Sequence, residues 1–240
     1  MTLLQESINA LFGIAGFAGG IGFGTIFLKK GYSLQRTYAL SKLESAMMPA
    51  IQVGLLVLVV AAPAFIFFSQ KGPGAMHAPW LISLAAGLVV GGLSQFSRLC
   101  TVGGFRDLFL FKKSILIFGY LAVLIGVFVV NISFGNFHLG FENQPIAHTD
   151  GLWNFLGMAL AGFCSVLLGG CPLRQLIMTG EGNSDSAVTV LGLAAGAAFA
   201  HNFGLAASGA GPTLNGEIAV GVGFVVALII AILNTKRANA

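Results

Sequence analysis

Hydrophobic residues occur along this chain in long runs that few charged residues interrupt. A helix needs about 20 predominantly apolar residues to cross the hydrocarbon core of a bilayer. Runs of about that length fall at 8–28, 47–68, 80–99, 114–134, 152–170, 187–207 and 215–234. The pattern therefore predicts an all-α, polytopic membrane protein with seven candidate transmembrane helices.

Composition agrees with a membrane protein. Of the 240 residues, 56% are hydrophobic and 8% are charged, whereas a soluble domain has about a quarter of its residues charged. The 34 glycines lie inside the apolar runs, which predicts close helix packing and breaks within helices. The run at 8–28 lacks the basic flank of a signal peptide, so we expect residues 1–240 to form a single transmembrane domain.

The basic residues predict the orientation, because lysine and arginine accumulate on the cytoplasmic side of membrane proteins. With the N-terminus outside and the C-terminus cytoplasmic, only Lys71 falls on the outer side. The other eleven fall on the inner side: Lys29, Lys30, Arg36, Lys42, Arg98, Arg106, Lys112, Lys113, Arg174, Lys236 and Arg237. The net charge of +4 reflects this inner rim and does not indicate nucleic-acid binding.

A short repeat is centred on two cysteines. The segment GGLSQFSRLC ends at Cys100 and GFCSVLLGGC ends at Cys171; in both, a glycine lies nine residues and a serine six residues before the final cysteine. The offset spans two helices, which predicts repeat units of the same direction around 80–134 and 151–207. Chance similarity of two glycine-rich helices explains the match equally well.

The residues around each cysteine predict a broken helix. Pro172 disfavours a helical conformation at Cys171 and suits the first position of a new helix, and Gly170 precedes the thiol. The pair Gly103 and Gly104 is expected to break the chain near Cys100, with Thr101 as a cap. Two facing breaks would expose thiols and backbone N–H groups at positive helix ends, where transporters bind anions.

A third thiol and three arginines extend this candidate site. Cys164 lies seven residues before Cys171, so on one continuous helix the two sulfurs share a face about 10 Å apart. Arg98, Arg106 and Arg174 give a positive field near the inner end, although anchoring at the membrane surface explains them as well. Asp107 is placed to neutralise Arg106.

Among the polar residues within apolar runs are Gln95, His201 and Asn202. They are candidates for lining a pathway, and hydrogen bonding between helices is the alternative. Soft, polarisable thiols suit a sulfur-bearing anion better than a hard oxyanion. Cu(I) is conceivable, but the chain lacks Cys-x-x-Cys and His-rich or Met-rich runs, so no metal and no cofactor is expected. Small-residue packing remains the simple explanation of the cysteines. We find no nucleophile–base pair, phosphate loop or nucleotide fingerprint, so no enzyme is predicted.

The segments QFSRLCTVGGFRDLF (95–109) and GGCPLRQLIMTGEGNSD (169–185) resemble the paired cysteine motifs of the YeeE/YedE family of bacterial inner-membrane proteins. The resemblance implies a multi-pass inner-membrane protein that takes up thiosulfate or a related sulfur compound. It also implies short re-entrant helices, and so about seven to nine transmembrane or re-entrant helices in all. The repeats would be inverted, and a relay of S–H···S hydrogen bonds would run through Cys100 and Cys171, with Arg106 and Arg174 beside them. Thiosulfate importers of the family have an additional early cysteine, and this sequence has none before Cys100.

The expected function is thus uptake of a small sulfur-containing anion across the lipid bilayer, relayed by cysteine thiols. The alternative is a membrane-bound thiol module that accepts or senses sulfur or selenium and passes it to a soluble, TusA-like sulfur carrier. A structural subunit of a larger permease is a third possibility.

Overall fold

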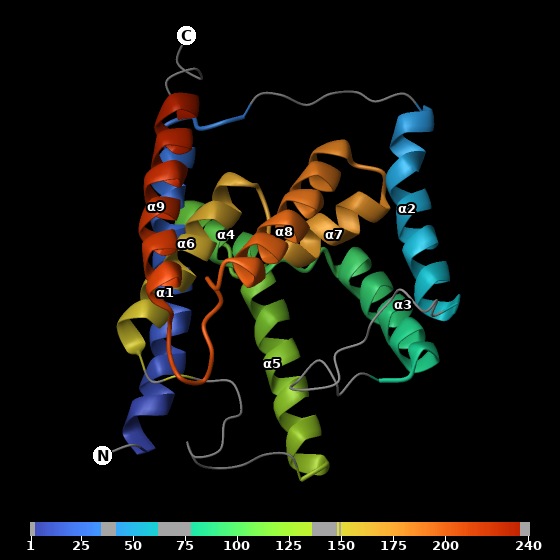
Figure 1. Cartoon of the computed structure of the whole chain (residues 1–240), viewed down its shortest axis with the longest axis horizontal. Coiled ribbons are helices and arrows are strands. Elements are labelled where there is room, and N and C mark those ends of the chain that lie inside the picture. Colours follow the sequence, from blue (N-terminus) through green and yellow to red (C-terminus); the bar gives the residue numbers. More distant parts are fainter. Residues whose placement is uncertain (1–2, 35–41, 62–77, 136–147, 149, 236–240) are drawn as a thin grey trace. The chain divides into compact units, whose positions relative to one another are not determined.

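The computed structural model of the chain describes residues 3–34, 42–61, 78–135, 148 and 150–235. Within these ranges the fold is all-α, as predicted, apart from one isolated β-bridge between Ser208 and Gly211. In chain order (Figure 1), the helices are α1 (Leu3–Lys29), α2 (Lys42–Ala61), α3 (Trp80–Ser97), α4 (Thr101–Phe111), α5 (Ile115–Ser133), α6 (Gly151–Leu167), α7 (Pro172–Gly180), α8 (Ser184–Asn202) and α9 (Leu214–Thr235).

Five segments of the described chain are long and apolar enough to cross a membrane. They are Leu11–Lys29, Trp80–Phe111, Ile115–Ser133, Gly151–Gly180 and Leu214–Thr235. The predicted spans at 47–68 and 187–207 are not among them. In α2 the apolar stretch Pro49–Leu58 is short, and the rest of that predicted span beyond Ala61 lies outside the described residues. Helix α8 is rich in alanine, glycine and serine, which contribute little hydropathy.

The chain divides into two compact units. The first comprises Met1–Arg36, Cys100–Pro172 and Leu191–Ala240, and the second comprises Thr37–Leu99 and Leu173–Val190. The chain therefore passes from one unit to the other immediately before Cys100 and immediately after Pro172. Four predicted inner or outer basic residues, Arg36, Lys71, Lys236 and Arg237, lie outside the described residues.

Helices α1 and α6 form the centre of the first unit and approach each other through glycines. A Cβ atom added to Gly16 would overlap the backbone of Phe155, and one added to Gly20 would overlap the backbone of Ala159. On α6, a Cβ atom on Gly162 would overlap the Phe17 carbonyl. Because the contacts advance together along both helices, α1 and α6 run parallel. Close packing through glycine, which the sequence predicted, is confirmed here.

Side chains of the first unit form two buried clusters. The cysteine cluster contains Ile21, Cys100, Val102, Val166 and Cys171, with Phe17, Leu28, Phe105 and Phe109 packed against it. The Phe163 cluster contains Tyr32, Phe163, Leu167, Ala227 and Ala231, with Phe27, Leu28, Leu160, Cys164, Phe224 and Leu228 at its edge. Helices α1 and α6 contribute to both clusters, so the packing that supports the fold also positions the two central cysteines.

Helix α5 contributes little to this core. It has no buried residue, although its sequence ILIFGYLAVLIGVFVVNIS is the most apolar of the spans. A helix that is hydrophobic all round is suited to a lipid environment. Its first turn nevertheless contacts α4, because Leu116 and Ile117 lie against Gly103 and Gly104.

Candidate functional site

Cys100 follows a helix that ends in a Schellman motif. At the end of α3, Arg98 has a positive φ of 51°, its N–H donates to the Gln95 carbonyl and the Leu99 N–H donates to the Ser94 carbonyl. These two bonds satisfy carbonyls that the helix end would leave without partners. The chain then extends through Cys100, at φ −151° and ψ 111°, and enters α4 at Thr101.

Cys171 is reached by the same local structure. At the end of α6, Gly169 has a φ of 82°, its N–H donates to the Val166 carbonyl and the Gly170 N–H donates to the Ser165 carbonyl. The next helix, α7, begins at Pro172. The serine that occurs six residues before each cysteine is thus the residue whose carbonyl closes the motif. The larger repeat units at 80–134 and 151–207 remain a prediction.

The break at Pro172 was predicted correctly, but the break near Cys100 was misplaced. Gly103 and Gly104 do not interrupt the chain; they lie in the first turn of α4, where they allow close approach of α5. Thr101 is not the cap. Cys100 is the N-cap residue, and its sulfur accepts a hydrogen bond from the Gly103 N–H at 3.2 Å. The helix has already ended at Arg98, so no further break is needed.

The two cysteine motifs, 71 residues apart, meet at Cys100 and Cys171. The Cys171 N–H donates to Cys100 Sγ at 3.4 Å. Cys100 is 8% exposed and Cys171 is 6% exposed. Cys100 Sγ therefore accepts two backbone N–H groups, one from the first turn of α4 and one from the break before α7, in a largely apolar environment.

Cys164 does not join this pair. The common face that we predicted for Cys164 and Cys171 requires one continuous helix between them, but α6 ends at Leu167 and the chain turns at Gly169. The Cys164 side chain is half-buried and packs at the edge of the Phe163 cluster. The predicted common face is therefore wrong, because the Schellman motif intervenes between the two thiols.

The arginines differ in their partners. Arg106 of α4 forms a salt bridge with its neighbour Asp107, with Nη2 and Oδ1 2.9 Å apart, so the predicted neutralisation is confirmed. In the second unit, Arg174 of α7 donates through Nη1 to Gln95 Oε1 of α3 at 3.0 Å. Among the described residues no carboxylate forms a salt bridge with Arg174. Arg98 is exposed and occupies the left-handed position that ends α3.

The other predicted residues are placed as follows. Gly170 is buried directly before Cys171. His201 and Asn202 are exposed at the end of α8, and the Asn202 side chain donates to the Ala198 carbonyl of its own helix at 2.7 Å. Of the predicted set, the structure thus brings together Cys100 with Cys171 and Gln95 with Arg174.

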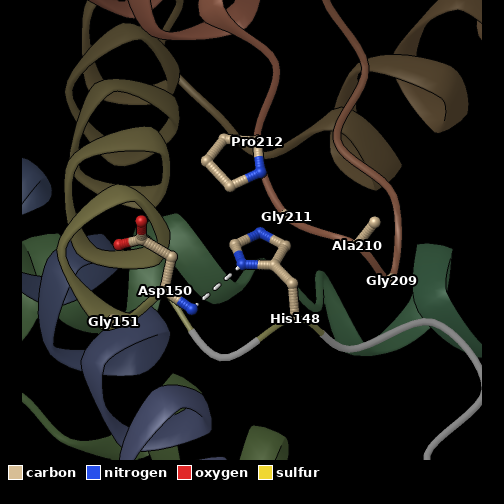
Figure 2. Close-up of a pocket in the computed structure, with 7 residues that line it drawn as sticks. All are labelled: His148, Asp150, Gly151, Gly209, Ala210, Gly211 and Pro212. Carbon is tan, nitrogen blue, oxygen red and sulfur yellow. Dashed lines mark hydrogen bonds between the residues drawn. The ribbon is translucent and has the colours of Figure 1, made fainter.

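Sequence reasoning missed two features of the first unit. Tyr32 Oη donates to the carbonyl of Leu167, the last residue of α6, at 3.3 Å, and no motif around Tyr32 indicated this contact. A cavity of about 470 Å³ lies where α6 begins (Figure 2), lined by His148, Asp150, Gly151, Gly209, Ala210, Gly211 and Pro212. The His148 ring lies between Asp150, whose N–H it accepts at 3.3 Å, and the loop at 209–212.

Comparison with known families decides the relationship. A family model described as sulphur transport matches residues 96–236, which is more than half of the chain. The chain belongs to the YeeE/YedE sulphur transport family. No curated protein and no solved structure matches it.

Membership in the YeeE/YedE family indicates a multi-pass membrane protein that transports a sulphur compound, rather than an enzyme. The matched residues include all three thiols and, apart from Gln95, the segments 95–109 and 169–185. They exclude α1, although Ile21 and Phe17 of α1 pack against the cysteine pair. The part of this YeeE/YedE protein outside the matched range therefore helps to build the wall of the candidate site.

Proposed function

We propose that this protein takes up thiosulfate, or a related anion with a terminal sulfur, and that Cys100 and Cys171 relay the anion across the narrowest part of its path. One observation carries the proposal: two buried cysteines from separate broken helices are in direct contact, because the Cys171 N–H donates to Cys100 Sγ. Family membership supports a sulphur compound as the substrate.

The chemistry of the pair suits an anion that presents sulfur. Thiols are weak hydrogen-bond donors and soft groups, so a terminal sulfur can replace one thiol as the partner of the other at small cost. A hard oxyanion would lose strong hydration in the apolar wall of Ile21, Val102 and Val166 without equivalent donors in return. The pair therefore discriminates by softness, and a direct exchange of S–H···S bonds moves the anion past it.

We also propose that Arg174, three residues after Cys171 in the sequence, receives the anion together with Gln95 on the inner side. Their hydrogen bond of 3.0 Å holds the guanidinium in place, and the charge of Arg174 is not matched by a described carboxylate. Arg106 contributes less, because Asp107 neutralises it. The direction, from an outside N-terminal side to a cytoplasmic C-terminal side, follows from the distribution of basic residues.

The test is uptake of radiolabelled thiosulfate into proteoliposomes that contain the purified protein. Cys100→Ala and Cys171→Ala should each lower the uptake rate about ten- to a hundredfold, because a hydrogen bond to a charged partner is worth about 1.5–3 kcal/mol. Cys164→Ala is the matched control. It is also a cysteine-to-alanine change, but Cys164 lies on α6 at the edge of the Phe163 cluster, so the variant should retain most of the wild-type rate.

Three results would contradict the proposal. Wild-type uptake by both Cys100→Ala and Cys171→Ala would show that the pair is not on the path. Loss of uptake in Cys164→Ala, with a normal elution profile of the purified variant, would show that the path runs through the other thiol. Uptake of sulfate at the same rate as thiosulfate would show that the thiols do not select a soft terminal sulfur over a hard oxyanion.

A second function is favoured by the two backbone N–H groups at Cys100 Sγ, since such donors also stabilise a thiolate. A Cys100 thiolate could attack the outer sulfur of thiosulfate, forming a cysteine persulfide and releasing sulfite, and a soluble TusA-like carrier could then accept that sulfur. Thiosulfate labelled at the outer sulfur distinguishes the two functions. If the protein is a membrane-bound thiol module, the label stays covalently attached to the protein. If the protein is a relay, the label reaches the vesicle lumen.

A further inference from the structure

The contact between Cys100 and Cys171 has the ligand chemistry of a soft-metal site. Each cysteine is buried, and each comes from a different broken segment; the two segments are in contact where the Cys171 N–H donates to Cys100 Sγ. Thiolate sulfur selects Cu(I) over harder cations such as Mg²⁺ and Ca²⁺. We propose that Cys100 and Cys171 together bind one Cu(I) ion as a two-coordinate bis-thiolate site.

The number of ligands selects the metal. Among the described residues, no group of three or more histidine, cysteine or acidic side chains is arranged to hold a metal ion. Zinc structural sites and iron–sulfur clusters need four protein ligands, so the pair cannot satisfy them. A d¹⁰ monovalent ion such as Cu(I) accepts two sulfur ligands, which is the number that this site provides.

The surroundings of Cys100 compensate the charge of the complex. Binding replaces two thiol protons by one cation, 2 RSH + Cu⁺ → [Cu(SR)₂]⁻ + 2 H⁺, and leaves one net negative charge. Two backbone N–H groups, of Gly103 at 3.2 Å and of Cys171 at 3.4 Å, already point at Cys100 Sγ. Cys100 also caps the positive end of α4. Hydrogen bonds to a ligating sulfur orient it and tune the metal, and the start of a helix stabilises negative charge.

The packing around the pair limits competing ligands. Ile21, Val102 and Val166 are between 0% and 2% exposed and form the rest of the cluster. Water and chloride therefore have little room at the two sulfurs. Where the proposed relay operates, a bound Cu(I) would occupy both thiols and stop the exchange of S–H···S bonds, so copper would inhibit uptake.

The binding test needs no transported substrate, so its result does not depend on the proposed function. Purified full-length protein in detergent, under anaerobic reducing conditions, competes for Cu(I) with the chromogenic chelator bathocuproine disulfonate. We expect one Cu(I) per chain for the wild type and for Cys164→Ser. Cys100→Ser and Cys171→Ser should weaken binding by more than about a hundredfold, since a change beside a metal ligand alone costs ten- to a hundredfold.

X-ray absorption at the copper edge provides a measurement on the wild type alone, in case either variant fails to fold. Two sulfur neighbours and no nitrogen or oxygen neighbour are expected. Absence of binding by the wild type, unchanged affinity in Cys100→Ser or Cys171→Ser, loss of binding in Cys164→Ser, or a three-coordinate spectrum would each overturn the site. Loss of uptake on adding Cu(I) to wild-type proteoliposomes tests the inhibition separately.

Discussion

Single residues decide where the two helices break. Pro172 predicted the break at Cys171, because proline disfavours a helical conformation at the residue before it. The break at Cys100 was placed too late, since the residue in the left-handed conformation there is Arg98. Glycine usually occupies that position, so an arginine gives no signal in the sequence. The serine six residues before each cysteine is visible in the sequence as part of the repeat. Its role is clear only from the structure, where the carbonyls of Ser94 and Ser165 accept the backbone hydrogen bonds that end the helices.

Tyr32 links the end of α1 to the end of α6, directly before the turn that leads to Cys171. Its hydroxyl group donates to the Leu167 carbonyl at 3.3 Å. Burial raises the pKa of Tyr32 above its ordinary value near 10, and the nearby Cys164 adds to this. The phenol therefore keeps its proton throughout the neutral range and remains a donor.

Replacing Tyr32 by Phe should lower the free energy of unfolding by about 1 kcal/mol at neutral pH, because a buried carbonyl loses its partner. Since the pKa is raised in the folded state, the stabilisation by Tyr32 is complete below about pH 10 and declines as the pH rises through the folded-state pKa. The difference in thermal midpoint between wild type and Tyr32→Phe should thus shrink in alkaline buffer. A difference that stays constant from pH 7 to strongly alkaline pH would contradict this assignment.

Among the helices, the sequence indicated how they pack but not which of them pair. Glycines spaced by four in GFAGGIGFG are typical of close helix contacts, and α1 does present Gly16 and Gly20 to a neighbour. The neighbour is α6, more than a hundred residues away in the sequence. Helix α6 also has small residues, Ala159 and Gly162, at the positions that face α1. The local sequence does not identify the partner helix, because several helices of this chain carry small residues at helical spacing.

Gly20 and Gly19 allow a matched test of this contact. A Cβ atom at Gly20 would overlap the backbone of Ala159, whereas at Gly19 it would meet only the ring of Phe155 at 3.9 Å. Gly20→Ala should therefore destabilise the protein by roughly 1–3 kcal/mol, the cost of overpacking. Gly19→Ala should be neutral or slightly stabilising, because alanine favours helix. Thermal unfolding in detergent measures both, and equal midpoints for the two variants would refute the close contact.

The course of the whole chain is constrained by three parallel helices. Helices α1 and α6 run in the same direction, and α9 runs with them: Gly223 lies against Leu160, and Ala227 and Ala231 pack with Leu167. In Figure 1, α1 and α9 of the first unit both run in the direction away from the end marked N. The end of α6 is thus near the end of α9, while the start of α9 lies at the opposite face of the unit.

The chain must return across the membrane between α6 and α9 if all three helices span it. Helix α7 has nine residues, about 14 Å, whereas α8 has 19 residues, about 28 Å, and only the latter matches the thickness of the hydrocarbon core. The far end of α8 does meet the start of α9, because Thr213 donates to the Gly204 carbonyl and Asn215 to the Phe203 carbonyl. We therefore expect α8 to cross the membrane despite its low hydropathy, in agreement with the transmembrane span predicted at 187–207.

Cysteines introduced before and after α8 test this crossing. Glu181 and Ser208 are both exposed, and the native pair Cys100 and Cys171 is buried and should react slowly with a membrane-impermeant maleimide. With basic residues on the cytoplasmic side, Ser208→Cys should be labelled from outside in intact cells, and Glu181→Cys only after the cells are opened. The unmodified protein gives the background from Cys164. Labelling of both variants from the same side would mean that α8 does not cross. In that case α6 and α9, being parallel, could not both span the bilayer, and the five apolar segments would have to be threaded differently.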